Sequence, residues 1–104
     1  MTDLLEQISA LLGASARDLD QLEHTLTDGY AQALSLEAEK WRLEKRIAEV
    51  AQGIETGDTA KKARELTSLT KRLDGNHDDI ALLRSLLGEL RRHVDDVRVG
   101  SPSR

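Results

Sequence analysis

A heptad repeat of apolar residues constrains this chain more than any other feature of its sequence. Apolar residues recur at alternating spacings of three and four from Leu5 to Ile54, and the pattern resumes from Leu66 to Val97. A repeat that averages 3.5 residues keeps one apolar seam of an α-helix facing a partner helix. Four seam positions carry a polar residue or glycine: Ser15, Gly29, Lys40 and Asn76. We therefore expect an all-α fold dominated by long helices.

A short segment that contains two glycines separates the heptad runs. Gly53 suits the left-handed position just past a helix C-terminus, and Thr56 or Asp58 suits the cap of the following helix. Because a short loop makes two long amphipathic helices antiparallel neighbours, the sequence predicts a long antiparallel two-helix coiled-coil hairpin. We expect a single helical domain over residues 1–104 with these segments: an N-terminal helical extension 2–12, a first long helix 14–52, a hairpin loop 53–58, a second long helix 59–98 and a flexible tail 99–104.

Two strings of residues with poor helix propensity lie inside this pattern. Gly13-Ala14-Ser15 is able to end a short N-terminal helix, with Ser15 capping the next helix, and Asp74-Gly75-Asn76 resembles a turn. The heptad phase nevertheless continues through both strings without a slip. A loop would have no reason to preserve that phase, so we expect continuous helix with local weakness at both places.

The register of the hairpin follows from the layers in which an antiparallel coiled coil stacks its two seams. One alignment pairs residues whose numbers total 109, and it centres the turn inside the loop 53–58. It predicts a layer of Leu22 with Leu87 and a layer of Leu43 with Leu66. It also predicts a weak waist, where small residues meet the turn-prone string, made by Gly29 (against Ile80), Ala33, Gly75 and Asn76. A buried Asn at such a position is able to fix the register of a coiled coil.

The N-terminal extension leaves apolar side chains beyond the end of this alignment. Four of them overhang the predicted hairpin: Leu4, Leu5, Ile8 and Leu11. An isolated helix of about twelve residues is marginal in water, so the segment either folds back at Gly13 as a third helix or docks on a second chain. We prefer the second solution, a homodimer that packs two hairpins into a four-helix bundle, because residues 1–39 are acidic and residues 40–72 are basic.

A further apolar surface is predicted on the outer side of the first long helix. It consists of Tyr30, Leu34, Ala38 and Trp41, which lie away from the hairpin seam. Trp and Tyr anchor protein contacts more often than most residues, and an exposed stripe of this kind is unusual in a soluble monomer. We expect these residues to bind a partner, either a second copy of the chain or another helical protein.

Composition argues against several other classes of protein. The chain has no Cys, and its three His do not converge with other ligands, so we expect neither a metal site nor a cofactor. No catalytic motif or convergent set of charged residues is present, so we expect no enzymatic activity. The first residues lack the basic start of a signal peptide, and no apolar run is long enough for a bilayer, which favours a cytoplasmic protein without membrane contact.

The best interpretation of the sequence is a non-enzymatic coiled-coil interaction or scaffold protein. A secretion- or export-type chaperone, or a small secreted helical hairpin, is the second interpretation, because such proteins share the long-hairpin architecture. The third is a module that contacts nucleic acid through a basic hairpin tip, which includes Lys61, Lys62 and Arg64. Acidic residues alternate with these bases, so nucleic acid is the less favoured partner.

Overall fold

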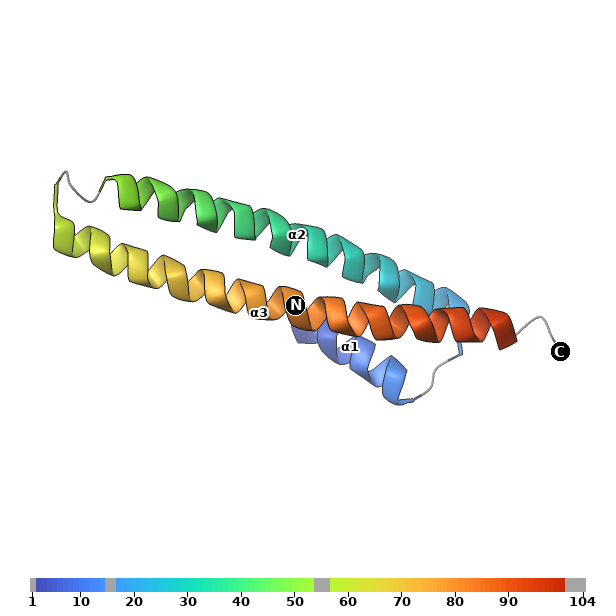
Figure 1. The fold of residues 1–104 in the computed structure, drawn as a ribbon. Helices are drawn as coiled ribbons and strands as arrows, with labels where there is room; N and C mark the ends of the chain where they lie inside the picture. Colours follow the sequence, from blue (N-terminus) through green and yellow to red (C-terminus); the bar gives the residue numbers. More distant parts are fainter. Residues whose placement is uncertain (1, 15–16, 54–56, 101–104) are drawn as a thin grey trace. The chain divides into compact units, whose positions relative to one another are not determined.

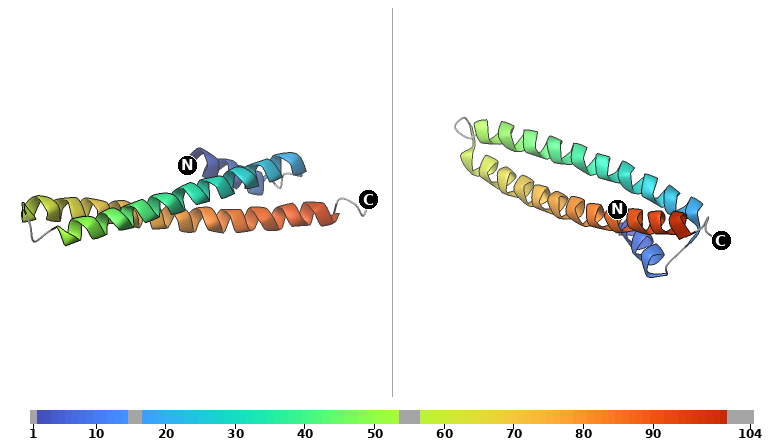
Figure 2. Two further views of the ribbon diagram at one scale, coloured as in Figure 1. Left: turned by 90° about the horizontal axis from the view of Figure 1, so that it is seen from above. Right: turned by 45° about the vertical axis from the view of Figure 1, so that its right-hand side comes forward.

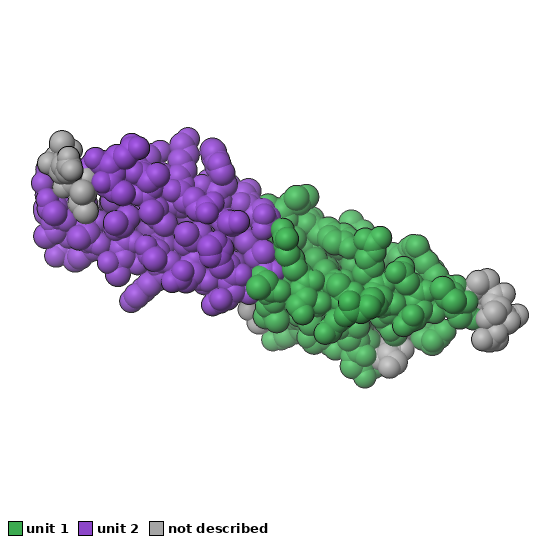
Figure 3. Space-filling model, in the orientation of Figure 1, with its two compact units in different colours: residues 1–34, 81–104 green, residues 35–80 purple. Residues whose placement is uncertain are grey.

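The computed structural model describes residues 2–14, 17–53 and 57–100 of the 104-residue chain. Within these ranges the backbone forms three α-helices and no strand: α1 (Thr2–Gly13), α2 (Leu19–Gln52) and α3 (Thr59–Gly100) (Figure 1). The prediction of an all-α fold is confirmed. The chain divides into two compact units, unit 1 with residues 1–34 and 81–104 and unit 2 with residues 35–80, and each is described by itself (Figure 3).

The first helix ends earlier than the heptad phase indicates. α1 stops at Gly13 and α2 starts at Leu19, so the predicted helix over 14–52 is wrong at its beginning. Asp18 determines the new start, because its Oδ1 accepts a hydrogen bond of 3.2 Å from the backbone N–H of Gln21, as an N-cap does. Ser15, the predicted cap, lies outside the described residues. An unbroken heptad phase therefore did not require an unbroken helix.

In unit 1, α1 folds back beside the first half of α2 (Figure 2). Nε2 of Gln7 donates a hydrogen bond of 3.0 Å to Oγ1 of Thr25, and both Ile8 and Thr25 are fully buried. Leu11 is also buried, while Leu4 and Leu5 are half-buried. The expectation that a second chain covers Ile8 and Leu11 is wrong, because the same chain already covers them.

The packing of Gly29 gives the register of α2 and α3 within unit 1. A Cβ atom added to Gly29 would lie 2.2 Å from Cδ2 of Leu87, so the Leu87 side chain fills the space that the glycine leaves. The numbers of these two residues total 116 instead of 109. The predicted register, which set Leu22 against Leu87 and Gly29 against Ile80, is therefore wrong by one heptad. The physical reason is that aliphatic seam residues recur every seven positions, so the position of the loop alone could not select between two registers that differ by one heptad.

Two polar pairs beside the seam of unit 1 agree with the corrected register. Arg98 forms an ion pair with Glu23, and Arg91 donates a hydrogen bond to Tyr30. In each pair the two residue numbers total 121, and each residue directly follows a seam residue of its helix. Pairs of this kind give a total of 121 when the facing seam residues total 116. The flanks and the seam of unit 1 therefore indicate one alignment.

In unit 2, the second half of α2 runs antiparallel to the first half of α3. The contacts proceed from Leu36 with Asn76 to Gly53 with Lys62, so residue numbers rise along α2 as they fall along α3. The core contains Leu43, Val50 and Leu69, with Ile47, Leu66 and Leu73 packed against them. A total of 116, as in unit 1, would arrange these six residues in three aliphatic layers: Leu43 with Leu73, Ile47 with Leu69, and Val50 with Leu66. The predicted register would instead set the buried Val50 against Thr59, which is exposed.

The ends of the two helices in unit 2 are capped by polar groups. Oδ1 of Asp58 accepts a hydrogen bond of 3.0 Å from the N–H of Lys61, which confirms Asp58 as the cap of α3. Nζ of Lys62 donates to the carbonyl of Gly53 just past the end of α2. The left-handed glycine is Gly57, with φ of 95°, and not Gly53 as predicted. The other predicted cap, Thr56, lies outside the described residues.

The turn-like string in the second helix does not interrupt it. α3 continues through Asp74, Gly75 and Asn76, as the heptad phase predicts, and ends at Gly100, slightly beyond the expected 98. Gly75 is exposed, and a Cβ atom added there would meet nothing within 4 Å. The glycine therefore lies away from the packed seam, where its cost is only the lower helix propensity.

Candidate interaction site

The outer side of α2 carries large apolar side chains in each unit. In unit 1, Tyr30 is 43% exposed and Leu34 is 73% exposed. In unit 2, Trp41 is 62% exposed, and Ala38 is also exposed. The structure thus leaves all four predicted contact residues of α2 open to solvent within this single chain. The other predicted contact residues, on α1, are buried or half-buried and do not belong to this surface.

Both aromatic side chains of this set, Tyr30 and Trp41, contact a cationic side chain. Arg91 donates to Tyr30, and this hydrogen bond is the main reason that the pKa of Arg91 lies above its usual value. Nζ of Lys45, one turn after Trp41, lies 5.2 Å from the centroid of the indole ring. At an exposed position such a cation–π contact contributes about 0.5–1 kcal/mol. These contacts orient both rings in the single chain.

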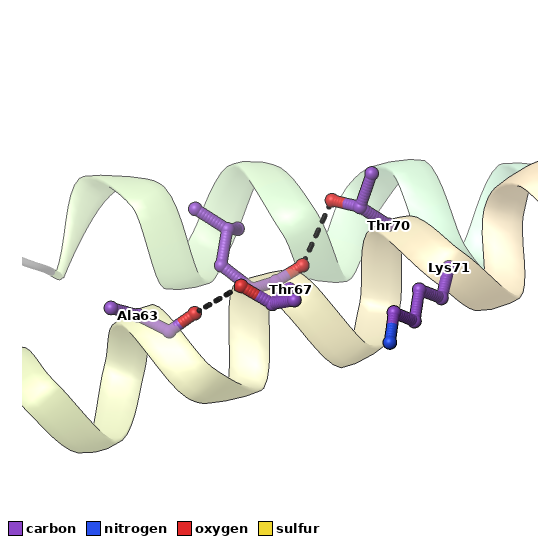
Figure 4. Close-up of a pocket in the computed structure, with 5 residues that line it drawn as sticks. Ala63, Thr67, Thr70 and Lys71 are labelled. Atoms are coloured by element: carbon purple, nitrogen blue, oxygen red, sulfur yellow. Dashed lines mark hydrogen bonds between the residues drawn. The ribbon is translucent and has the colours of Figure 1, made fainter.

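A shallow groove of about 430 Å³ lies on α3 in unit 2, and the sequence analysis missed it (Figure 4). Ala63, Leu66, Thr67, Thr70 and Lys71 line it. The Thr67 hydroxyl donates to the carbonyl of Ala63 at 3.0 Å, and the Thr70 hydroxyl donates to that of Leu66 at 2.8 Å. Because both hydroxyls are satisfied within the helix, the threonines offer mainly methyl groups to a partner. The spacing of Ala63, Thr67 and Thr70 by four and three residues is the sequence signal for this face.

Helical periodicity places this groove and Trp41 on the same side of unit 2. If the seam positions are named a and d, Trp41 and Thr67 are b positions and Ala63 and Thr70 are e positions. In an antiparallel pair the e positions of both helices flank one side of the seam, and the g positions flank the other. This side of unit 2 therefore combines Trp41 and the small residues of the groove with the charged e positions Glu37 and Glu44 of α2.

The charged side of unit 2 is built from ion pairs. NH2 of Arg46 lies 2.7 Å from Oε1 of Glu65, and NH1 lies 3.6 Å from Oε2 of Glu49. The hydrogen bond with Glu65 is the largest cause of the raised pKa of Arg46. A groove of about 320 Å³ on this side is lined by Glu39, Arg42, Leu43, Arg46, Leu69 and Arg72. Arg42 and Arg72 form no ion pair with any described residue, so they are available to an anion.

The part of the chain that the structure describes gives no support for a metal site or a membrane-spanning helix. No three His, Asp or Glu side chains there are grouped as metal ligands. None of the described helices has the length and apolar character needed to cross a lipid bilayer. No family model, curated protein or solved structure matches the chain, so its own residues must carry the functional argument.

Proposed function

We propose that this protein is a non-enzymatic interaction protein that acts by helix–helix association. In this proposal α2 and α3 form a long antiparallel coiled-coil hairpin, and two hairpins pair into a homodimer with a four-helix core. The observation that carries the proposal is the exposure of Trp41 and Leu34, although the seams of both units are already filled. Large apolar side chains of this kind are the usual anchors of protein interfaces.

Charge supports a second copy of the chain as the partner. Residues 1–39 contain eight acidic residues and one base, Arg17, whereas residues 40–72 contain nine bases and five acids. The first half of α2 in one copy is thus complementary to residues 40–72 of another, where Lys71 borders the groove. In the proposed dimer, Leu34 of one copy packs on the methyl groups of Thr67 and Thr70 of the other. Close approach is favourable there because the groove residues are small.

Replacing Leu34 and Trp41 together with Ser should dissociate the dimer without unfolding the chain. Removing an anchor residue typically costs about 2 kcal/mol or more of binding free energy, so we expect the dissociation constant to rise by more than about tenfold. Sedimentation equilibrium measures the dissociation constant, and circular dichroism measures the helix content. The matched control is Leu82→Ser with Val99→Ser, which removes two exposed apolar side chains from α3. Equal dimerisation of both double variants would refute the proposed surface.

A charge in the groove of α3 should weaken the dimer from the other side of the interface. We expect Thr67→Glu to raise the dissociation constant by about tenfold, because the new carboxylate meets the acidic half of the partner. Ser68→Glu is the control, since it adds the same charge at the next, exposed position of the helix. A dissociation constant that responds equally to the two substitutions would show that net charge, and not the groove, controls association.

The groove on the charged side of unit 2 supports a second candidate function, nucleic-acid binding. Two of its arginines, Arg42 and Arg72, are without an ion pair to any described residue and offer bidentate hydrogen bonds to phosphates. Glu39 also lines the groove and opposes such binding, which is why this function ranks second. The test is fluorescence anisotropy of a labelled duplex at low salt, with Arg42→Ala and Arg72→Ala as a double variant. Binding that is lost in this variant and falls steeply with added salt would favour the second function.

A further inference from the structure

The side-chain amide of Asn76 is buried in unit 2, and only its nitrogen forms a hydrogen bond. Asn76 is 6% exposed, and its Nδ2 donates a hydrogen bond of 3.0 Å to the carbonyl of Leu36. Its Oδ1 is also buried but accepts no hydrogen bond from the described residues. A buried acceptor without a donor opposes folding, because it has lost its water and gained nothing. The buried Oδ1 of Asn76 therefore needs a hydrogen-bond donor close to it.

Lys40 is the residue whose position answers this need. Lys40 and Asn76 are both seam residues of unit 2, and they share a layer when the facing seam numbers total 116, as they do in unit 1. Lys40 also ends the helical turn that Asn76 touches, because the carbonyl of an α-helical Leu36 accepts the backbone N–H of residue 40. The Lys40 side chain is half-buried and forms no hydrogen bond or ion pair with any described residue.

We infer that Lys40 and Asn76 form a polar layer that selects the register of α2 against α3, with the Lys40 ammonium donating a hydrogen bond to Oδ1 of Asn76. The aliphatic seam residues do not select the register by themselves, because they recur every seven residues and tolerate a shift of one heptad. The same shift would set Lys40 against Leu69 and Asn76 against Ala33. Each polar group would then face an apolar one, so the shift would bury two unsatisfied groups in place of one satisfied pair.

This layer explains why two polar residues occupy an otherwise aliphatic seam. A polar pair in a coiled coil contributes less to stability than two leucines, but it penalises the wrong alignment. The inference concerns pairing within one chain, so it stands independently of the proposed dimer.

Engineered disulfides test the inference directly, because the natural chain has no Cys. Leu43→Cys with Leu73→Cys reports the register that totals 116, and Leu43→Cys with Leu66→Cys reports the register shifted by one heptad, which totals 109. In the natural background we expect intrachain oxidation of the first pair and little of the second. After Lys40→Leu with Asn76→Leu, we expect oxidation of the second pair to increase by about tenfold, since both alignments are then aliphatic.

The exchanged variant, Lys40→Asn with Asn76→Lys, keeps a polar layer and serves as the control. It should oxidise like the natural background, and circular dichroism should show every background to be helical. If the second pair stays reduced in the double-leucine background, aliphatic packing alone selects the register and the inference is overturned. Oxidation of the second pair in the exchanged variant would also overturn it, because a matched polar layer would then have failed to hold the register.

Discussion

Replacing Leu83 with Ala should lower the free energy of unfolding by about 2–5 kcal/mol, the usual cost of removing a buried leucine side chain. Leu83 is fully buried in unit 1, so the substitution removes apolar contacts and leaves a cavity. A small domain is stable by only about 5–15 kcal/mol, so this loss is a large fraction of the total. Urea unfolding at one fixed protein concentration measures it, since the proposed dimerisation would make the apparent stability depend on concentration.

Leu82 provides a control for this prediction at the next position of the same helix. Its side chain is 49% exposed, so Leu82→Ala removes the same atoms with less loss of burial. We expect a cost below about 1 kcal/mol, because a surface substitution leaves no closed cavity. Similar unfolding midpoints for the two variants would contradict the burial pattern of α3 in unit 1.

The second large effect is expected at Gly29, where Gly29→Ala should destabilise the protein although it raises helix propensity. The new methyl group would lie 2.2 Å from Cδ2 of Leu87, so Leu87 must adopt another rotamer in a packed core. Overpacking of this kind costs about 1–3 kcal/mol, and the gain in helix propensity offsets about 1 kcal/mol of that. Adding Leu87→Ala should remove the clash, so the double variant should lose less stability than the two single variants predict together.

Gly75 is the matched control because it is a helical glycine with open space around it. Gly75→Ala should stabilise the protein by about 0.5–1 kcal/mol, since only backbone entropy and helix propensity change. The two Gly→Ala substitutions are thus expected to have opposite signs. If both stabilise the protein and Gly29→Ala is additive with Leu87→Ala, the contact between residues 29 and 87 is absent and the register of unit 1 is wrong.

The helical content was predictable because the heptad repeat is long and contains few exceptions. The repeat also correctly predicted that α3 continues through Asp74, Gly75 and Asn76, where local propensity indicates a turn. The same repeat did not predict the end of the helix at Gly13, because a second amphipathic helix can start in the same heptad phase after a loop. The N-cap at Asp18 was the better signal there, and a cap depends on one residue and not on a period.

The register was harder to predict than the helices for a related reason. Aliphatic residues that repeat every seven positions give almost the same pattern after a shift of one heptad. Centring the turn inside the loop 53–58 was therefore a weak criterion for choosing the register. The exceptions to the repeat are the informative residues: Gly29 lies against Leu87, and Lys40 would share a layer with Asn76 only if the numbers in unit 2 also total 116.

The candidate site was predicted in part. The exposure of Tyr30, Leu34 and Trp41 follows from their positions outside the seam of α2. The groove on α3 was missed because a threonine counts as polar in a binary pattern. Thr67 and Thr70 instead satisfy their hydroxyls within the helix, which leaves their methyl groups for contacts.

Sedimentation equilibrium of the natural chain tests the proposed function most directly. The protein should sediment with twice the mass of one chain at micromolar concentration, and its Trp41 fluorescence should shift to shorter wavelength as the dimer forms. The shift is expected because Trp41, exposed in the single chain, becomes buried at the interface. A single-chain mass at high micromolar concentration, with fluorescence typical of a hydrated indole throughout, would contradict self-association through α2.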